Sequence, residues 1–362
     1  MKIEELLKLL NERNASDLHL TVGVPPMLRI YGRLVRTEFP NLTPEDTKSL
    51  AYSLMNQRQK ERFEAEKEID FSYGLSGVGR FRVNIYHQRG SIGIAIRGIS
   101  FNIPKLEELG LPKSLEELTK KPKGLILVTG PTGSGKSTTL ASLIDLINET
   151  RDCHIVTVED PIEYVYSHKK SIVNQREVGS DTLSFVNALR AALREDPDVI
   201  LIGEMRDLET IQAAITAGET GHLVFATLHT NNASQTIERI IDVFPPHQQE
   251  QIKLQLSNTI EAIISQRLLP RKPEKIVANG ILSGRVVAIE YLVATPAVRN
   301  LIREGKTYMI PNVIQTGSQF GMTTMDQSLI SLYKMGEISW DNFINNISNR
   351  EEALKAVGGM IR

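Results

Sequence analysis

A glycine-rich run near the middle of the chain contains the residue types that a phosphate-binding loop requires. Residues 130–137 read Gly-Pro-Thr-Gly-Ser-Gly-Lys-Ser and fit the pattern G-x-x-x-x-G-K-[ST], between an apolar strand at 125–128 and a helical segment at 138–149. In such a loop the backbone N–H groups turn toward phosphate, and the N-terminus of the following helix favours an anion. The lysine would reach the β- and γ-phosphates of ATP, and the serine hydroxyl would ligate Mg²⁺. The residues expected to bind nucleotide are Gly130, Thr132, Gly133, Ser134, Gly135, Lys136, Ser137 and Thr138.

A second apolar strand ends in an acidic residue that could act on a bound nucleotide. Residues 198–204 read Asp-Val-Ile-Leu-Ile-Gly-Glu and end at Glu204. In phosphate-loop enzymes a carboxylate at this place holds Mg²⁺, directly or through water. Glu204 is therefore the metal candidate beside Ser137, with an ordinary strand-end carboxylate as the alternative. Asp196 and Asp198 precede the strand and are expected to cap or solvate a turn at its other end.

A further strand runs into acidic residues at 159–163. Because the C-terminal ends of neighbouring parallel strands converge on one crevice, these carboxylates could meet the same ligand. Hydrolysis of the γ-phosphate needs a group that orients or deprotonates water. Asp160 and Glu163 are the candidates, and spacing alone does not choose between them. Asp160 could instead cap a helix that starts at Pro161.

Two histidines stand at opposite ends of the apolar strand at 222–228. His222 and His229 are seven residues apart, so they point to opposite faces of the strand and cannot ligate one metal together. A hydrogen-bonded structural histidine explains each of them more simply than catalysis does. His229 is the better functional candidate, because the C-terminal end of the strand lies nearer the expected phosphate site.

Three arginines in the first hundred residues could meet a phosphate. Arg80 and Arg82 alternate along one strand and so share a face, and Arg97 ends the next strand. A solvated strand face is the simpler interpretation. The alternative is that these side chains reach nucleotide phosphate across a domain or subunit interface, as arginine fingers do.

Length, charge and cysteine usage limit the class of protein. The chain has 362 residues, enough for about two domains. Lys plus Arg number 42 and Asp plus Glu number 43, and the resulting net charge of −1 argues against a dedicated nucleic-acid binder. Cys153 is the only cysteine, which excludes an internal disulfide and a cysteine-based zinc site and fits a reducing compartment. The N-terminal segment lacks an apolar signal region and no apolar run approaches a membrane span, so a cytoplasmic protein is expected.

The periodicity of apolar residues predicts a first domain of mixed type. Residues 1–100 combine short alternating strands with a helix at 1–14 and a second helix from Thr43 to about Glu68, which indicates a small α+β domain. Residues 101–122 mix proline, glycine and charge and are expected to form a linker with one helix.

From residue 123 onward the pattern changes to uninterrupted apolar strands separated by helices. This pattern is typical of a parallel sheet covered on both faces. The expected strands lie at 124–129, 154–158, 199–203 and 222–228. The tail from 296 to 362 is expected to be mostly helical.

Together these motifs resemble the PilT family, the retraction ATPases of type IV pili within the wider secretion-ATPase superfamily. Residues 297–304 (AVRNLIRE) are similar to the family's AIRNLIRE element, with Val298 in place of isoleucine, and residues 321–326 (GMTTMD) are similar to its C-terminal signature. Ser16-Asp-Leu-His-Leu resembles the opening of the superfamily's N-terminal domain. Four boxes occur in the family's order: the phosphate loop at 130–137, an aspartate box at 157–166, a Walker B box at 196–206 and a histidine box at 220–233.

The resemblance implies a fold and a set of catalytic roles. The fold would be α/β, with a PAS-like α+β domain at 1–100, a linker at 101–122 and a RecA-like P-loop ATPase domain with a mostly parallel sheet and a helical C-terminal region at 123–362. The enzyme would hydrolyse ATP with Mg²⁺. The implied roles are water activation for Glu163, action at the metal for Glu204, transmission of nucleotide state for His229 and His222, and contact with nucleotide from the N-terminal domain for Arg82 and Arg97, with Arg80 as a further candidate.

The resemblance also implies partners. The chain would form a homohexameric ring with nucleotide between subunits, and the ring would work on an inner-membrane platform protein and thus indirectly on pilin, with no nucleic-acid partner. It would be cytoplasmic and peripheral to the inner membrane through the pilus machinery. Pilus-assembly relatives typically carry a four-cysteine zinc element and an additional N-terminal region, so Cys153 alone in 362 residues favours retraction. The alternatives are a retraction-accessory paralogue of the same family, a non-catalytic partner of another ring ATPase and a RecA-like nucleic-acid motor.

Overall fold

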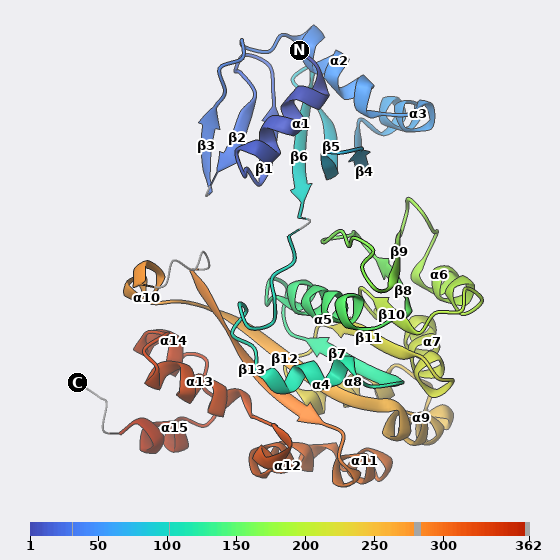
Figure 1. Ribbon diagram of the computed structural model, residues 1–362, viewed down its shortest axis with the longest axis vertical. Coiled ribbons are helices and arrows are strands. Elements are labelled where there is room, and N and C mark those ends of the chain that lie inside the picture. The colour runs from blue at the N-terminus through green and yellow to red at the C-terminus, as the bar shows by residue number, and fades with distance from the viewer. Residues whose placement is uncertain (31, 101, 279–283, 359–362) are drawn as a thin grey trace. The chain divides into compact units, whose positions relative to one another are not determined.

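The computed structural model describes residues 1–30, 32–100, 102–278 and 284–358. Contacts within the chain divide it into two units (Figure 1). Unit 1 comprises Met1–Asn102 together with the short segment Ile162–Val165, and unit 2 comprises Ile103–Pro161 and Tyr166–Arg362. Among the residues described, no helix combines the length and the apolar character that crossing a membrane requires.

Unit 1 is built on a six-stranded antiparallel sheet with the order β3-β2-β1-β6-β5-β4. Three helices accompany it, so the expectation of a small α+β domain is confirmed. The strands are β1 (Asp17–Leu20), β2 (Met27–Ile30), β3 (Arg33–Arg36), β4 (Glu68–Leu75), β5 (Gly79–Gln88) and β6 (Ser91–Ile99), and the helices are α1 (Ile3–Glu12), α2 (Pro44–Leu54) and α3 (Gln57–Glu66).

The core of unit 1 lies between these helices and one face of the sheet. Helix α1 buries the four apolar residues that its spacing placed on one face, Ile3, Leu6, Leu7 and Leu10. Strand β5 alternates, with Phe81 and the next two odd-numbered residues buried and the even-numbered residues more exposed. The even-numbered positions therefore form the face of the sheet that the core does not use.

The prediction of one helix from Thr43 to about Glu68 is wrong, because the segment forms two helices. Helix α2 begins as expected, with the Thr43 hydroxyl accepting from the Asp46 N–H. Met55 is extended, with φ −100° and ψ 137°, and ends α2. The Asn56 side chain then accepts from the Gln59 N–H at 2.9 Å and the Gln59 side chain returns a contact to the Asn56 N–H at 2.9 Å. This reciprocal capping box stabilises a new helix start at α3, so the chain does not continue α2 through Asn56.

Unit 2 is built on a seven-stranded sheet with the order β13-β12-β7-β11-β10-β8-β9. All neighbours are parallel except β13, which pairs antiparallel with β12 at one edge. The expectation of an α/β fold with a mostly parallel sheet is confirmed. The strands are β7 (Gly124–Thr129), β8 (His154–Glu159), β9 (Ile172–Glu177), β10 (Val199–Ile202), β11 (Leu223–Leu228), β12 (Ile260–Pro270) and β13 (Arg285–Val293).

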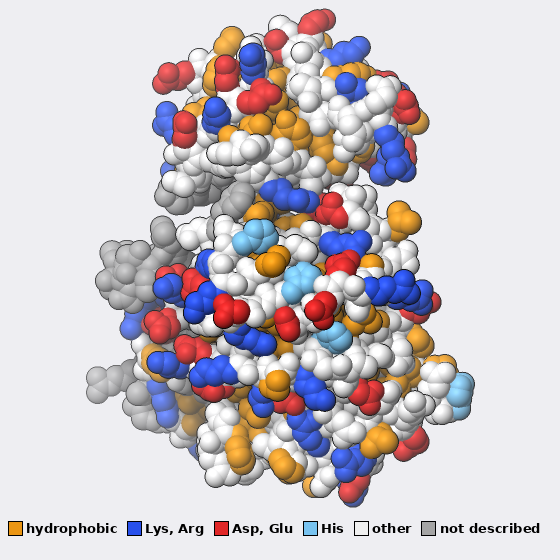
Figure 2. All heavy atoms as spheres, turned by 45° about the vertical axis from the view of Figure 1, so that its right-hand side comes forward, with side chains coloured by type: hydrophobic (Ala, Val, Ile, Leu, Met, Phe, Trp, Pro, Cys, Tyr) orange, Lys and Arg blue, Asp and Glu red, His pale blue; other side chains and the backbone are white. Residues whose placement is uncertain are grey.

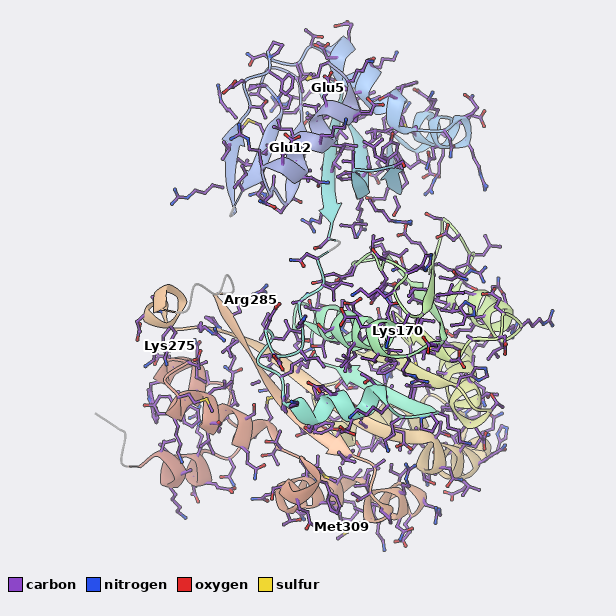
Figure 3. The ribbon with its side chains drawn as sticks, viewed as in Figure 1. Glu5, Glu12, Lys170, Lys275, Arg285 and Met309 are labelled. Atoms are coloured by element: carbon purple, nitrogen blue, oxygen red, sulfur yellow. The ribbon has the colours of Figure 1, made fainter. Side chains whose placement is uncertain are left out.

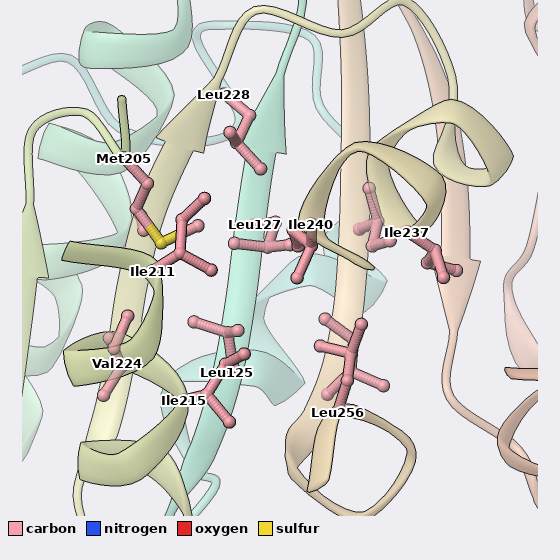
Figure 4. Close-up of a cluster of buried hydrophobic side chains, with 14 of the residues drawn as sticks. Leu125, Leu127, Met205, Ile211, Ile215, Val224, Leu228, Ile237, Ile240 and Leu256 are labelled. Carbon is pink, nitrogen blue, oxygen red and sulfur yellow. The ribbon is translucent and has the colours of Figure 1, made fainter. Parts of the chain in front are cut away.

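The central strands of this sheet are buried along their whole length. Every residue of β7, β10 and β11 is buried, which is why their sequences are apolar without alternation. On one face, side chains from α7 and α8, among them Ile215 and Ile240, pack against Leu125 and Leu127 of β7 (Figure 4). Burying one such aliphatic side chain contributes about 1.5–3 kcal/mol relative to leaving it in water.

Three strands of unit 2 were not predicted from the sequence. Strand β9 reads Ile-Val-Asn-Gln-Arg-Glu and lies at an edge of the sheet, where polar residues remain exposed. Strands β12 and β13 form an antiparallel hairpin whose connection contains α10 (Pro273–Ala278) and part of which lies outside the described residues. Figure 3 labels Lys275 of α10, which lies within this connection, and Arg285, with which β13 begins.

The remaining helices follow the strands in chain order. The C-terminal part is helical up to Val357, as expected, and residues 359–362 lie outside the described part. Within 103–122, four leucines are buried: Leu106, Leu111, Leu115 and Leu118. The helices are η1 (Lys113–Leu115), α4 (Glu116–Thr119), α5 (Lys136–Thr150), α6 (Phe185–Ala192), α7 (Leu208–Glu219), α8 (Ala233–Asp242), α9 (Pro246–Thr259), α11 (Pro296–Arg303), η2 (Thr307–Met309), α12 (Ile310–Thr316), η3 (Ser318–Phe320), α13 (Met325–Lys334), α14 (Trp340–Ile344) and α15 (Arg350–Val357).

Candidate active site

The glycine-rich loop joins the end of β7 to the start of α5. Gly133 has φ +78° and Gly135 has φ +93°, conformations that side-chain-bearing residues rarely adopt. Gly130 is required for another reason, since a Cβ there would lie 2.4 Å from the backbone oxygen of Gln266 in β12. Helix α5 begins at Lys136, directly after Gly135. The first N–H groups of α5, which have no partner within the helix, are thus available for an anion.

The charged and hydroxyl groups of the loop are held at the start of α5. Lys136 is buried, and its Nζ donates to the backbone oxygens of Gly130 at 2.9 Å and of Pro131 at 3.1 Å. The ammonium group is therefore held against the loop, and Ser137 follows it half-buried in the first turn of α5. Of the other predicted nucleotide contacts, Thr132 and Gly133 are exposed, Ser134 is buried, and Gly135 and Thr138 are half-buried.

The segment after β10 is fixed by the two strands beside it. The Gly203 N–H donates to the Val158 backbone oxygen of β8 at 2.7 Å, and the Met205 N–H donates to the Thr227 backbone oxygen of β11 at 3.1 Å. A Cβ on Gly203 would approach the β8 backbone to 3.2 Å, so glycine permits the close approach. Glu204 is held between these two anchors, at the same edge of the sheet as the ends of β7 and β11.

Two basic side chains meet the Glu204 carboxylate. Arg206 Nη2 lies 2.7 Å from Glu204 Oε2, and His229 Nε2 lies 3.3 Å from Glu204 Oε1. Partial burial raises the pKa of Glu204, but Arg206, with weaker effects from His229 and Lys136, outweighs it and lowers the pKa below its usual value. The structure thus brings together Glu204 and His229, which the sequence analysis selected separately, near enough to Lys136 for its charge to act on the carboxylate. The Glu204 carboxylate is ionised at neutral pH.

Arg206 is the member of this cluster that sequence reasoning missed. It lies two residues after Glu204 in the irregular segment between β10 and α7, and the two side chains meet there. The box at 196–206 contained this signal, an arginine at i+2 from the strand-end acid. The Glu204 carboxylate raises the pKa of Arg206, which is positively charged at neutral pH.

The donor set fits Mg²⁺ held in the company of phosphate. A hydroxyl on Ser137 and a carboxylate on Glu204 are oxygen ligands of the kind that Mg²⁺ prefers, and such ions commonly use one or two protein ligands plus substrate phosphates and water. No cluster of three or more His, Cys, Asp or Glu that could hold a metal occurs among the described residues.

The acids after β8 have different surroundings. Glu159 is buried and accepts from Thr157 Oγ1 at 2.7 Å and from Gln175 Nε2 at 3.1 Å. The helix that Asp160 was considered to cap does not form, since the residues from Pro161 onward are irregular, so that alternative is wrong. Glu163 is exposed and groups with unit 1, where the Val165 N–H donates to the Ser100 backbone oxygen. Water activation by Glu163 stays a prediction.

Two of the candidate arginines lie side by side on the sheet of unit 1. Arg82 and Arg97 are directly opposite each other in the register of β5 and β6, on the face away from the core. Arg97 Nε lies 2.9 Å from Asp17 Oδ1, and the Arg97 side chain is 70% exposed. Contact of these two arginines with nucleotide stays a prediction. His222, in unit 2, makes a structural contact with the Ala217 backbone oxygen at 2.9 Å.

The fold and this site define a class of protein. A phosphate loop that opens α5, with an ionised carboxylate and a histidine after the neighbouring parallel strands, is the arrangement of a P-loop nucleotide-binding protein. A family model described as type II/IV secretion system protein matches residues 93–342.

Comparisons with known proteins narrow this class. The chain is 49% identical over 342 residues to the type IV pilus retraction ATPase PilT of Pseudomonas aeruginosa, covering 94% of this chain and 97% of that protein. It is 50% identical to a twitching motility protein of Neisseria gonorrhoeae, covering 87% of this chain and 82% of that protein. A crystal structure of the pilus retraction motor PilT with bound ADP matches with 53% identity and a TM-score of 0.87, over 97% of this chain and 98% of that one. The chain belongs to the type II/IV secretion system protein family and, within it, to the PilT family.

Proposed function

We propose that this chain is the ATP-hydrolysing motor that powers retraction of type IV pili, and thereby twitching motility. The observation that carries the proposal is the 49% identity to a pilus retraction ATPase along nearly the whole of both chains. The structure supports it with a phosphate loop, an ionised Glu204 and an adjacent His229 in one unit. These are the groups that phosphoryl transfer to water requires.

Each residue of the candidate site has a role in ATP hydrolysis. The loop N–H groups and Lys136 bind the β- and γ-phosphates of ATP, and Ser137 and Glu204 are the residues that would hold Mg²⁺. The metal would neutralise charge on the phosphates when bound. Glu163 orients water for in-line attack on the γ-phosphate. His229 reports loss of the γ-phosphate through its contact with Glu204.

The second unit and the assembly complete the proposal. Unit 1 corresponds to a PAS-like domain and unit 2 to a RecA-like ATPase domain. In a homohexameric ring, Arg82 and Arg97 of the PAS-like domain reach nucleotide and stabilise charge in the transition state. Hydrolysis then releases these contacts and lets the domains rotate. The ring works in the cytoplasm on an inner-membrane platform protein, and pilin leaves the fibre as a result.

A retraction-accessory paralogue is the second candidate. The chain is 43% identical to the type IV pilus ATPase PilU of Pseudomonas aeruginosa, covering 94% of this chain and 87% of that protein. The identity to PilT is higher, which favours the retraction motor itself. A nucleic-acid motor is disfavoured by the net charge of −1. On the face shown in Figure 2, basic and acidic side chains are interspersed and form no continuous basic surface.

The decisive experiment combines turnover with a phenotype. Lys136→Ala should abolish ATP hydrolysis by the purified protein, whereas Lys170→Ala, which changes an exposed lysine of the same unit, should leave it intact (Figure 3). A strain that lacks the gene should carry excess pili and fail to twitch, and the Lys136→Ala gene should not restore movement.

The possible outcomes separate the candidates. Loss of pili in the deletion strain would contradict retraction. Hydrolysis at the wild-type rate by Lys136→Ala would contradict the assignment of the active site. Full twitching in the deletion strain, with weaker retraction only under load, would favour the accessory paralogue. Stimulation of hydrolysis by DNA would revive the nucleic-acid motor.

A further inference from the structure

One buried carboxylate joins two helices that are distant in the sequence. Glu290, in β13, is 9% exposed, and its Oε1 accepts from the Ala233 N–H at 2.8 Å. The backbone N–H of Met325 also faces this carboxylate and lowers its pKa. Ala233 is the first residue of α8, and Met325 is the first residue of α13. The N-termini of both helices therefore converge on a single side chain.

The electrostatics explain why an acid occupies this place. The first N–H groups of a helix lack partners within it and carry partial positive charge. Burial, with a weaker effect from Asp326, raises the pKa of Glu290 above its usual value, and the two N–H groups and Arg267, which act in the opposite direction, reduce this rise without cancelling it. A carboxylate has two acceptor oxygens and no fixed donor when ionised, so it can satisfy both helix ends at once.

Helix α8, one of the two helices that meet at Glu290, begins close in sequence to the candidate active site. Only three residues separate Ala233 from His229, the histidine that contacts Glu204. These residues are tied to the first turn of α8, because Thr230 Oγ1 lies 2.7 Å from Thr236 Oγ1. In addition, Asn232 Oδ1 accepts from the N–H of the third helical residue at 2.8 Å. A displacement of His229 must therefore be absorbed at, or passed to, the N-terminus of α8.

Helix α13, the other helix that meets Glu290, is joined to the helices that follow it. The Asp326 carboxylate, in the first turn of α13, accepts from the Ser348 N–H at 2.9 Å and from the Asn349 N–H at 2.8 Å, just before α15. Tyr291, next to Glu290, pairs through its backbone with Thr323 just before α13. Helices α13, α14 and α15 share one apolar core. A movement of the N-terminus of α13 would thus also move α14 and α15.

We propose that Glu290 is a positioning residue that couples the loop carrying His229 to helices α13–α15. This inference rests on the proposed function, in which His229 changes its contact when ATP is hydrolysed. The C-terminal helices would then be an output of the nucleotide cycle, linked to it by one carboxylate across β13.

Glu290→Gln is the informative substitution, because it keeps the shape of the side chain but turns one acceptor into an NH₂ donor. The glutamine has one acceptor oxygen in place of two and no charge, so it attracts the two helix N-termini less strongly than a carboxylate does. We expect kcat for ATP hydrolysis to fall by about tenfold, with the Kd for ADP within about twofold of wild type. Ser328→Ala is the matched control, because its Oγ accepts from the Ile289 N–H at 3.1 Å and joins α13 to β13 without contact to α8. It should leave both quantities near wild type.

Two readouts separate coupling from a purely structural role. In a His229→Ala background, Glu290→Gln should cause no further loss of kcat, whereas independent effects would multiply. In the wild-type protein, hydrogen exchange in residues 322–335 should differ between the ADP and ATPγS states, and the difference should vanish in Glu290→Gln. Wild-type kcat in Glu290→Gln, multiplying losses in the double variant, or equal effects of Ser328→Ala would each overturn the proposal.

The hydrogen-exchange experiment tests the coupling between His229 and α13 even if Glu290→Gln fails to fold. His229→Ala alone should remove the nucleotide-dependent difference in residues 322–335, and its persistence would overturn the coupling. A wild-type protein without any ATP turnover would refute the proposed function, whereas normal turnover without the exchange difference would refute only the role of Glu290.

Discussion

Replacing Glu204 by glutamine tests the assignment of this residue without changing its size. The carboxylate lies 2.7 Å from Arg206 Nη2 and 3.3 Å from His229 Nε2, and its side chain is 21% exposed. Although partial burial raises its pKa, the basic neighbours lower it further than burial raises it, so the group is ionised at neutral pH. Glu204→Gln therefore removes a full negative charge from the end of β10.

The loss of this charge should affect catalysis far more than stability. A metal ion that neutralises charge on the phosphates is worth several kcal/mol in the transition state, so loss of a carboxylate that would hold it should lower kcat by about 10²–10⁴-fold. Affinity for ADP should stay equal or rise, because one negative charge facing the phosphates is gone. Arg206 is 61% exposed and returns to water, so the free energy of unfolding should change by less than about 1 kcal/mol.

Asp198→Asn supplies the control from the same strand. Asp198 precedes β10 at its other end, where its Oδ2 accepts from the His154 N–H at 2.8 Å. Phosphate release in the steady state gives kcat and KM, calorimetry gives the Kd for ADP, and urea titration gives the stability. The assignment is refuted if Glu204→Gln keeps more than about a tenth of the wild-type kcat, or if Asp198→Asn loses as much.

Three further predictions follow from burial, backbone geometry and charge. Leu127→Ala truncates a fully buried side chain and should lower the free energy of unfolding by about 2–5 kcal/mol in urea titrations, and a change below about 1 kcal/mol would contradict the packing described. Gly130→Ala places a Cβ 2.4 Å from the Gln266 backbone oxygen, so ADP affinity measured by calorimetry should fall at least about tenfold, and wild-type affinity would show that the loop can move aside. Burial raises the pKa of Asp17, but hydrogen bonds to the carboxylate, one of them from Arg97, outweigh it and lower the pKa. The charged form of Asp17 thus stabilises the fold above the unfolded-state pKa, and this stabilisation is lost as pH falls through the folded-state pKa. The wild-type Tm should therefore drop more steeply than the Tm of Asp17→Asn below about pH 4. Parallel curves of Tm against pH would argue against the ion pair.

Elements with a strong local signal were predictable from the sequence. The spacing of Ile3, Leu6, Leu7 and Leu10 predicted the buried face of α1, because the helical period is a local property. The break between α2 and α3 was missed, although Asn56 and its third neighbour form the capping pattern that starts a helix. Strands β9, β12 and β13 were missed because polar edge positions and hairpin partners acquire their pattern only from the neighbouring strands.

The candidate site was predictable residue by residue, and not as a cluster. Lys136, Glu204 and His229 were each selected from the end of a strand or the start of a helix. Their meeting depends on the order β7-β11-β10, which places the ends of three strands side by side. Arg206 had no assigned role because its significance lies in the 2.7 Å contact with Glu204.

The sequence by itself determined the chemistry and the family of this protein. A phosphate loop and the boxes after it are contiguous runs, and the physical requirements of each run are met by residues that are neighbours in the chain. The tertiary structure alone decided which distant groups act together. The contact of His229 with Glu204 and the convergence of α8 and α13 on Glu290 arise from strand order and register, because cross-strand contacts join residues that no local pattern relates.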